Sequence, residues 1–185
     1  MNMQPTSRFS VRVPYYHQFR PRYPKAVIET LAGYGLIPDS IVADIGAGTG
    51  ISSELFLDYG CTVYAVEPNA EMRAACEHYY GERPRFHAID GTAEATTLAD
   101  HSIEWVTAGQ AFHWFDHAGA KTEFRRILRS GGNIALFWND RTENVSAFVS
   151  EYNAIMREFD IEQGGTPRAQ NLIAEEDQLI EFFAP

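Results

Sequence analysis

The sequence predicts an α/β fold with a doubly wound, mostly parallel sheet that helices cover on both faces. Short apolar runs rich in β-branched residues recur along the chain, and stretches with helical spacing of apolar residues lie between them. This alternation calls for right-handed crossovers, which make neighbouring strands parallel and place helices over both faces of the sheet.

Five apolar runs have the length and composition of ordinary strands. They cover residues 41–45, 62–66, 85–89, 103–107 and 133–138. We therefore expect a sheet of five strands in this part of the chain.

Capping residues mark the ends of the helices expected between these strands. The expected helices cover 24–36 with Pro24 in the first turn, 51–59 ending at Gly60, 70–80 between Asn69 and Gly81, and one from Asp116 that stops at Gly131-Gly132.

The pattern changes after Asn139. Residues 145–159 read as an amphipathic helix with Phe148, Tyr152, Ile155 and Phe159 on one side, and 173–183 as a further helix. We divide the single domain into an N-terminal cap and first helix (1–40), a core (41–140) and a helical lid segment (141–185).

The charge distribution argues against nucleic-acid binding. The net charge is −10, and residues 1–38 carry five basic residues against Glu29 alone, so the rest of the chain is strongly acidic. A nucleic-acid surface needs a basic face instead. Residues 1–12 contain no apolar run, and no stretch of the chain approaches the length of a membrane span, so we expect neither a signal peptide nor a membrane-spanning segment. Cys61 and Cys76 have no metal-ligand spacing, so we expect a cytoplasmic protein without a metal site.

A glycine-rich turn follows the first predicted strand. It reads Asp44-Ile45-Gly46-Ala47-Gly48-Thr49-Gly50, and a helix begins at once. Glycines at such a turn let a ligand approach the backbone at the carboxyl ends of the strands. The dinucleotide pattern G-x-G-x-x-G would need glycine where Ile51 stands, which disfavours a nucleotide-dependent oxidoreductase.

The second strand ends at Glu67, 17 residues after Gly50. A carboxylate at this place can accept hydrogen bonds from both hydroxyls of an adenosine ribose. NAD carries the same ribose, so Glu67 alone does not identify the cofactor.

With the later motifs in the same order, residues 16–140 resemble the class I S-adenosylmethionine-dependent methyltransferases, which have a Rossmann-like fold. The chain is most similar to the small-molecule branch that includes ubiquinone-biosynthesis and trans-aconitate methyltransferases. The later motifs are residues 90–94, 109–114 and 124–132, together with an N-terminal segment, 16–24, that resembles a cap over the cofactor.

The resemblance implies S-adenosylmethionine as cofactor and assigns roles residue by residue. It implies cofactor contacts for Asp44, Gly46, Ala47, Gly48, Gly50, Glu67, Pro68, Met72, Asp90, Gly91, Thr92, Ala93 and Gln110. It places Tyr16, Arg20, Tyr23 and Trp114 in the cap or substrate wall, and Gln110 and His113 at the site of methyl transfer.

Two of these residues have more than one interpretation. His113 is either a general base, because imidazole titrates near neutral pH, or a histidine packed at the end of a strand. Trp114 lies near the sulfonium cation, walls the substrate pocket or fills the core.

The function expected is methyl transfer to a small molecule, with oxygen of a small carboxylic acid as the leading acceptor because of the cap resemblance. A non-catalytic module that binds S-adenosylmethionine is the alternative.

The family usually completes its sheet with an antiparallel hairpin, and no such strands are visible before Pro185. We therefore expect a truncated version of a longer protein, in which 133–138 has an open edge that favours a homodimer.

Overall fold

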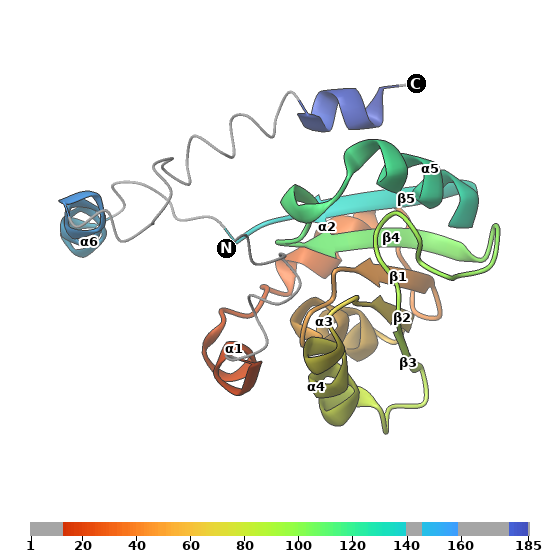
Figure 1. Cartoon of the computed structure of the whole chain (residues 1–185), viewed down its shortest axis with the longest axis horizontal. Helices are drawn as coiled ribbons and strands as arrows, with labels where there is room; N and C mark the ends of the chain where they lie inside the picture. The colour runs from red at the N-terminus through yellow and green to blue at the C-terminus, as the bar shows by residue number, and fades with distance from the viewer. Residues whose placement is uncertain (1–12, 140–145, 159–177, 185) are drawn as a thin grey trace, which may run out of the picture. The chain divides into compact units, whose positions relative to one another are not determined.

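The computed structural model describes residues 13–139, 146–158 and 178–184. The chain divides after Asn139 into two units, 1–139 and 140–185, and each is described by itself (Figure 1).

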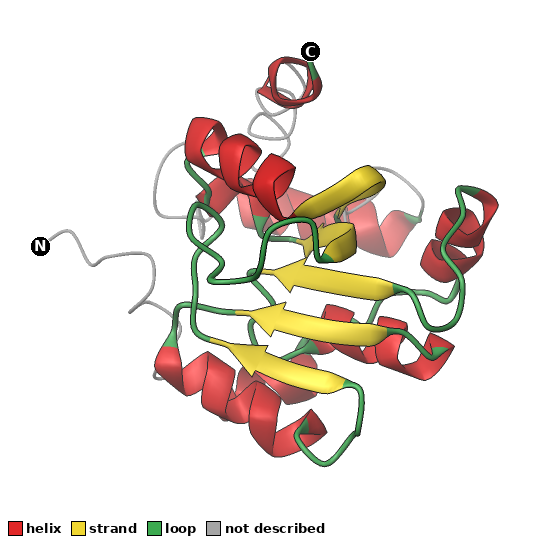
Figure 2. Ribbon diagram, turned by 90° about the vertical axis from the view of Figure 1, so that its right-hand side faces the viewer, coloured by secondary structure: helices red, strands yellow, loops and turns green. Residues whose placement is uncertain are grey.

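The first unit contains a five-stranded parallel sheet, which confirms the predicted fold class. The strand order is β3-β2-β1-β4-β5, so the chain winds outward in both directions from β1. Figure 2 shows helices flanking this sheet. The strands are β1 (Ile41–Ile45), β2 (Thr62–Val66), β3 (Phe86–Ile89), β4 (Ile103–Gly109) and β5 (Leu128–Phe137).

Six α-helices and one short 3₁₀ helix are described before residue 159. They are α1 (Val13–Phe19), α2 (Ala26–Gly33), α3 (Ile51–Tyr59), α4 (Ala70–Tyr80), η3 (Phe112–Trp114), α5 (His117–Ile127) and α6 (Ala147–Glu158).

Three of the predicted helix caps are confirmed. The Asn69 side chain accepts a hydrogen bond from the backbone N–H of Met72 at 2.9 Å, and Asp116 accepts one from Gly119 at 3.3 Å. Gly60 ends α3 in the left-handed conformation that L-residues disfavour. In the first turns of α4 and α5, one backbone N–H group each is therefore satisfied by the capping side chain that the sequence pattern predicts.

Two helix boundaries differ from the prediction. The helix expected over 24–36 is confined to α2, because Pro24 lies before its first turn and Gly35 adopts a positive φ after it. The helix from Asp116 was expected to stop at Gly131-Gly132. It ends at Ile127, because Leu128 is already extended and pairs with Ile103. Both glycines lie inside β5, beside a shift in its register with β4.

The core lies between the sheet and α3. Phe56 of α3 is fully buried with Val42 and Val63 of the central strands, and Trp105 of β4 joins the same cluster. Burial of this kind supplies the main favourable term in folding. It fixes the start of α3, and therefore the glycine turn that precedes it.

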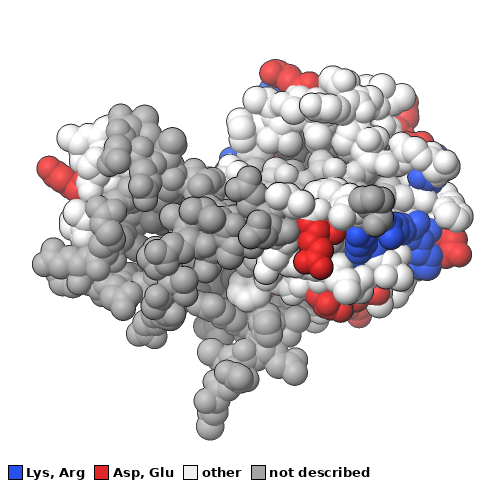
Figure 3. Space-filling view, turned by 90° about the horizontal axis from the view of Figure 1, so that it is seen from above, with Lys and Arg blue, Asp and Glu red and all other residues white. Residues whose placement is uncertain are grey.

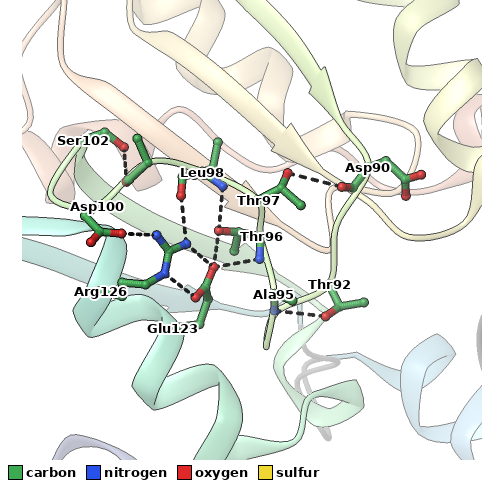
Figure 4. Close-up of polar contacts among 11 residues, drawn as sticks. Asp90, Thr92, Ala95, Thr96, Thr97, Leu98, Asp100, Ser102, Glu123 and Arg126 are labelled. Carbon is green, nitrogen blue, oxygen red and sulfur yellow. Dashed lines mark hydrogen bonds and ion pairs between the residues drawn. The ribbon is translucent and has the colours of Figure 1, made fainter.

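The connection from β3 to β4 contains no helix and is anchored to α5 instead. Glu123 accepts hydrogen bonds from the backbone N–H and hydroxyl of Thr96, at 2.8 and 2.6 Å (Figure 4). Arg126 donates to the carbonyl oxygen of Leu98 and to Glu123, and it pairs with Asp100. These contacts position the loop that carries residues 90–94.

The described part of the second unit is helical. In α6, Phe148, Tyr152 and Ile155 recur at helical spacing, and the rings of Phe148 and Tyr152 stack with centroids 6.4 Å apart. Residues 178–183 form another helix, whereas 173–177 of the predicted helix lie outside the described residues. Within the described part of the chain, no helix is both long and apolar enough to cross a membrane.

Candidate functional site

The candidate site lies at the carboxyl ends of the parallel strands. Ile45, Val66 and Ile89 are register partners, and each is the last residue of its strand. Gly46, Glu67 and Asp90 follow them directly, so the sheet brings together three motifs separated by more than twenty residues of chain. Gln110 follows β4 at the same edge and donates its backbone N–H to Phe137 at 3.0 Å.

The glycine turn and Glu67 are bonded to each other. The Glu67 carboxylate accepts hydrogen bonds from the backbone N–H groups of Gly48, at 2.8 Å, and Asn69, at 2.9 Å. These two bonds leave further acceptor positions on the carboxylate. Burial raises the pKa of Glu67 above its ordinary value, although both N–H groups and Arg73 oppose this shift.

Glycine is favoured at two positions of this turn for different physical reasons. Gly46 has a φ of 68°, and a Cβ at this position would come within 2.7 Å of Ala111, so the turn touches the segment after β4. Gly48 has a φ of 58°, and a Cβ there would meet nothing within 4 Å. The backbone at Gly48 therefore borders open space beside Glu67, which fits the approach of a ligand with ribose hydroxyls.

Asp44 differs from Glu67 because its carboxylate is fully buried and turned into the protein. The hydroxyls of Ser52 and Ser53 donate to one oxygen at 2.7 and 2.6 Å, and Thr107 donates to the other at 3.3 Å. Burial raises the pKa of Asp44 to about 6 despite these bonds. This arrangement ties β1 to α3 and β4, so it supports an indirect role in shaping the glycine turn.

Asp90 is exposed and forms an ion pair with Arg73 at 3.1 Å. Arg73 also donates to the backbone carbonyl of Glu67 at 2.6 Å, and it therefore joins the ends of β2 and β3. The sequence analysis did not identify Arg73. It lies four residues after the capping Asn69, on the same face of α4, which is the signal that could have found it.

The remaining residues expected at the cofactor lie around this edge. Pro68 is half-buried and Met72 is buried at the start of α4. Gly91 and Thr92 are followed by the buried Ala93, and Glu94 accepts the backbone N–H of Asp116 at 2.8 Å. Their contacts with a cofactor stay predictions.

Gln110 has an unusual backbone conformation for its residue type. Its φ is 57°, in the left-handed region that non-glycine residues rarely adopt. Its side-chain amide donates to the carbonyl oxygen of Asn139 at 2.8 Å, so the end of β4 is held to the second residue after β5. Local strain of this kind gathers at functional sites, and it supports the role predicted for Gln110.

Tyr23 covers the end of β4. Its ring meets Phe137 edge-on, with centroids 4.8 Å apart. A Cβ on Gly109 would come within 2.7 Å of the Tyr23 hydroxyl, so the two residues are in close contact. The structure thus brings Tyr23 beside Gln110. Arg20 is half-buried, and Tyr16 lies in α1 with its side chain outside the described part.

His113 and Trp114 lie in the 3₁₀ turn after Gln110, and both are exposed. His113 is therefore not buried at the end of β4, although its ring lies 4.9 Å from that of Trp114, and its role as a base stays a prediction. Trp114 is 45% exposed, so it does not fill the core.

A polar contact between α1 and the glycine turn was missing from the sequence analysis. His17 is buried, and its Nδ1 lies 3.1 Å from the hydroxyl of Thr49. Its ring stacks on Tyr79 at 3.7 Å, and its Nε2 lies 2.9 Å from Arg22. No local pattern in the sequence could have found this contact, because 32 residues separate His17 from Thr49.

A hollow lies at the amino ends of the strands, away from the glycine turn. It has a volume of about 580 Å³ around the amino ends of β4 and β5, and it is lined by His101, Leu128, Arg125, Arg129 and residues 130–132. Figure 3 views the molecule from the top of Figure 1 and shows a group of basic side chains beside acidic ones on this side. This hollow is separate from the glycine turn.

Comparison with known proteins agrees with this geometry. Residues 43–136 match the family described as the methyltransferase domain. An uncharacterised methyltransferase of Mycobacterium tuberculosis is 38% identical over 154 residues, which cover 80% of this chain and 58% of that protein. The chain thus spans somewhat over half the length of this curated relative.

Two solved structures are also similar. A putative type II methyltransferase from Anaeromyxobacter dehalogenans has 28% identity and a TM-score of 0.63, over 76% of this chain and 57% of that chain. A putative S-adenosyl-L-methionine-dependent methyltransferase from Methanococcus maripaludis has 18% identity and a TM-score of 0.69, over 99% and 86% of the two chains. The second likeness shows the fold alone.

The family match covers the glycine turn, Glu67 and Gln110, the residues that the parallel sheet brings to one edge. The chain belongs to the class I S-adenosylmethionine-dependent methyltransferase family, whose cofactor is S-adenosylmethionine.

Proposed function

We propose that the chain transfers a methyl group from S-adenosylmethionine to a small molecule, and that the leading acceptor is an oxygen of a small carboxylic acid. The observation that carries the proposal is the set of candidate site residues gathered at the carboxyl ends of the parallel strands. There the buried Glu67 faces the open backbone of Gly48, and the strained Gln110 lies beside Tyr23.

The site residues fit the two ends of the cofactor. Glu67 has acceptor positions for ribose hydroxyls, and the left-handed turn at Gly48 leaves room for a ligand against the backbone. S-adenosylmethionine supplies, when bound, a methyl group on a positively charged sulfur that is itself a good leaving group. Gln110 and Tyr23 would then align the acceptor and exclude water.

A carboxylate acceptor needs no general base, because its oxygen is already ionised at neutral pH. A hydroxyl or amine acceptor would need one, and His113 is an exposed imidazole three residues after Gln110. The choice of a carboxylic acid rests on the likeness of residues 16–24 to the cap of trans-aconitate methyltransferases.

The test is transfer of an isotopically labelled methyl group from S-adenosylmethionine to a metabolite extract and to a panel of small acids, phenols and amines. Mass spectrometry identifies the labelled product. A labelled methyl ester supports the carboxylic acid, whereas a labelled ether or amine would correct the acceptor. Binding of S-adenosylhomocysteine with no labelled product from any source would favour the non-catalytic module.

Variants of the two candidate catalytic residues refine the test. Gln110→Ala and His113→Asn should lower turnover more than cofactor affinity if both line the transfer site. His101→Asn is the matched control, because His101 is an exposed histidine near the opposite edge of the sheet. An unchanged pH–rate profile in His113→Asn would exclude this histidine as a base.

A further inference from the structure

His17 connects the N-terminal helix to the glycine turn through hydrogen bonds on both of its ring nitrogens. Nδ1 lies 3.1 Å from the Thr49 hydroxyl, and Nε2 lies 2.9 Å from a guanidinium nitrogen of Arg22. Arg22 reaches onward to Glu54 of α3 at 3.2 Å. The segment 17–22 is therefore bonded both to the glycine turn and to the helix that follows it.

The chemistry of these partners fixes the protonation state of His17. A guanidinium can only donate hydrogen bonds, so Nε2 must accept from Arg22 and carries no proton. His17 is then neutral, with its proton on Nδ1, and it donates this proton to the Thr49 hydroxyl. A doubly protonated His17 would have no acceptor for Arg22 and would place two positive charges side by side.

The surroundings of His17 disfavour its charged form. The ring is buried and stacks on Tyr79 of α4 at 3.7 Å, with Tyr80 of the same helix 6.1 Å away. Arg22 and Glu54 are the charged groups that act on the ring. Burial and then the Arg22 charge lower the pKa of His17, and Glu54 and the hydrogen bond with Thr49 oppose them more weakly.

The contact can affect cofactor binding because Thr49 lies between two left-handed glycines. Gly48 and Gly50 have φ values of 58° and 85°, and the N–H of Gly48 is bonded to Glu67. A fixed Thr49 limits the conformations of the turn before a ligand arrives. Preorganisation of this kind raises affinity by lowering the entropy lost on binding.

We propose that His17 is a pH-sensitive latch, a positioning residue that holds α1 on the glycine turn when neutral and releases it when protonated. The inference rests on the proposed cofactor site at that turn, because release of the latch is expected to weaken cofactor binding.

The direction of the pH effect follows from the lowered pKa of His17. The latched form binds fewer protons than the open form, so latching is fully favourable above the ordinary pKa of 6.5. It weakens as the pH falls below 6.5 towards the lowered value. One linked proton limits the contribution of His17 to about tenfold in the Kd per pH unit.

The first experiment measures the Kd for S-adenosylhomocysteine by calorimetry between pH 8 and pH 5. The variant His17→Gln keeps an acceptor for Arg22 and a donor for Thr49, but it cannot titrate. His78→Gln is the matched control, because His78 is an exposed histidine beside Tyr79 on α4. Asp44, with its raised pKa, titrates in the same range in all three proteins. The difference between wild type and His17→Gln therefore isolates His17.

We expect wild type and His78→Gln to lose more affinity below pH 6.5 than His17→Gln loses. The same pH profile in all three proteins would overturn the proposal. Absence of binding by wild type at pH 8 would contradict the proposed cofactor site and not the latch.

The second experiment tests the protonation state of His17 and the release of α1 in the absence of any ligand. Nitrogen-15 NMR of the imidazole rings should show His17 protonated on Nδ1 at pH 8, the tautomer that free histidine disfavours. Hydrogen exchange of residues 15–22, corrected for the intrinsic rate, should rise at pH 5 in wild type but not in His17→Gln. A proton on Nε2, or exchange that rises equally in both proteins, would show that His17 only packs against α4.

Discussion

Two buried carboxylates, those of Asp44 and Glu67, lie beside the glycines of the turn, and their hydrogen-bond partners distinguish their roles. The partners of Asp44 are the hydroxyls of Ser52, Ser53 and Thr107, all inside the protein. Glu67 is bonded to two backbone N–H groups at the rim of the turn and keeps acceptor positions free for a ligand. We therefore expect Glu67, and not Asp44, to be the carboxylate that contacts the cofactor.

Removal of this carboxylate should weaken cofactor binding. Two hydrogen bonds to a charged group are worth about 1.5–3 kcal/mol, so Glu67→Ala should raise the Kd for S-adenosylhomocysteine by about 10- to 100-fold. Calorimetry measures the effect, and Glu67→Gln, which keeps one acceptor oxygen, should fall between wild type and Glu67→Ala. Glu77→Ala on the exposed face of α4 is the control. Unchanged affinity in a folded Glu67→Ala protein would limit Glu67 to a structural role.

The sequence predicts Glu67 but not His17, for a physical reason. Glu67 is identified by its place at the end of a strand, and parallel strands carry their last residues to a common edge. The contact between His17 and Thr49 depends instead on how α1 docks, which no periodicity or spacing encodes. The sequence analysis placed Arg22 only within the basic N-terminal residues and the cap-like segment 16–24, whereas the structure gives it specific contacts with His17 and Glu54.

Among the elements, α5 holds the long connection between β3 and β4 through the side chains of Glu123 and Arg126. Glu123 is buried, and it satisfies the backbone N–H and hydroxyl of Thr96 while it pairs with Arg126. Arg126 and the hydrogen bonds from Thr96 lower the pKa of Glu123 to about 2. The loop with residues 90–94 is therefore held by charge-assisted bonds and not by a helix.

The variant Glu123→Gln should destabilise the fold by about 1–3 kcal/mol at pH 7, because it weakens bonds to a buried charged group. Because the folded pKa lies below the ordinary 4.5, this stabilisation is present above pH 4.5 and is lost as the pH falls towards 2. Urea unfolding of wild type and variant should thus converge at acidic pH. Glu82→Gln, at an exposed acid after α4, serves as the control. A constant difference across this pH range would contradict the assignment.

The helices and strands follow from local sequence patterns, except where a local signal competes with a long-range contact. Gly60, Asn69 and Asp116 mark helix ends because each supplies a local cap. Gly131-Gly132 resembles a helix stop in the same way, yet both glycines lie in β5. The pairing of Leu128 with Ile103 begins the strand five residues earlier than expected, and such a long-range contact overrides the local signal.

At the scale of the whole molecule, β5 is the last strand in the order of the described sheet. Ile134 and Leu136 on this strand are half-buried. An open edge with apolar side chains favours pairing with another chain, so we expect self-association at high protein concentration. Light scattering should show a smaller mass for Ile134→Lys than for wild type, because an edge lysine opposes pairing. Tyr34→Lys is the control at an exposed residue after α2. Equal masses for all three proteins would exclude association through β5.

Cofactor binding should stabilise the whole first unit, because the glycine turn, Glu67 and Gln110 follow three different strands of one sheet. A ligand that binds only the folded state at a hundred times its Kd adds about 2.7 kcal/mol to the free energy of unfolding. For a chain of this size, each kcal/mol raises the Tm by about 2–4 °C, so S-adenosylhomocysteine should raise the Tm by roughly 5–10 °C. NAD should not raise it, because Ile51 replaces the third glycine of the dinucleotide pattern. Thermal scans with each ligand test the choice, and a shift with NAD but none with S-adenosylhomocysteine would contradict the cofactor assigned to this sheet edge.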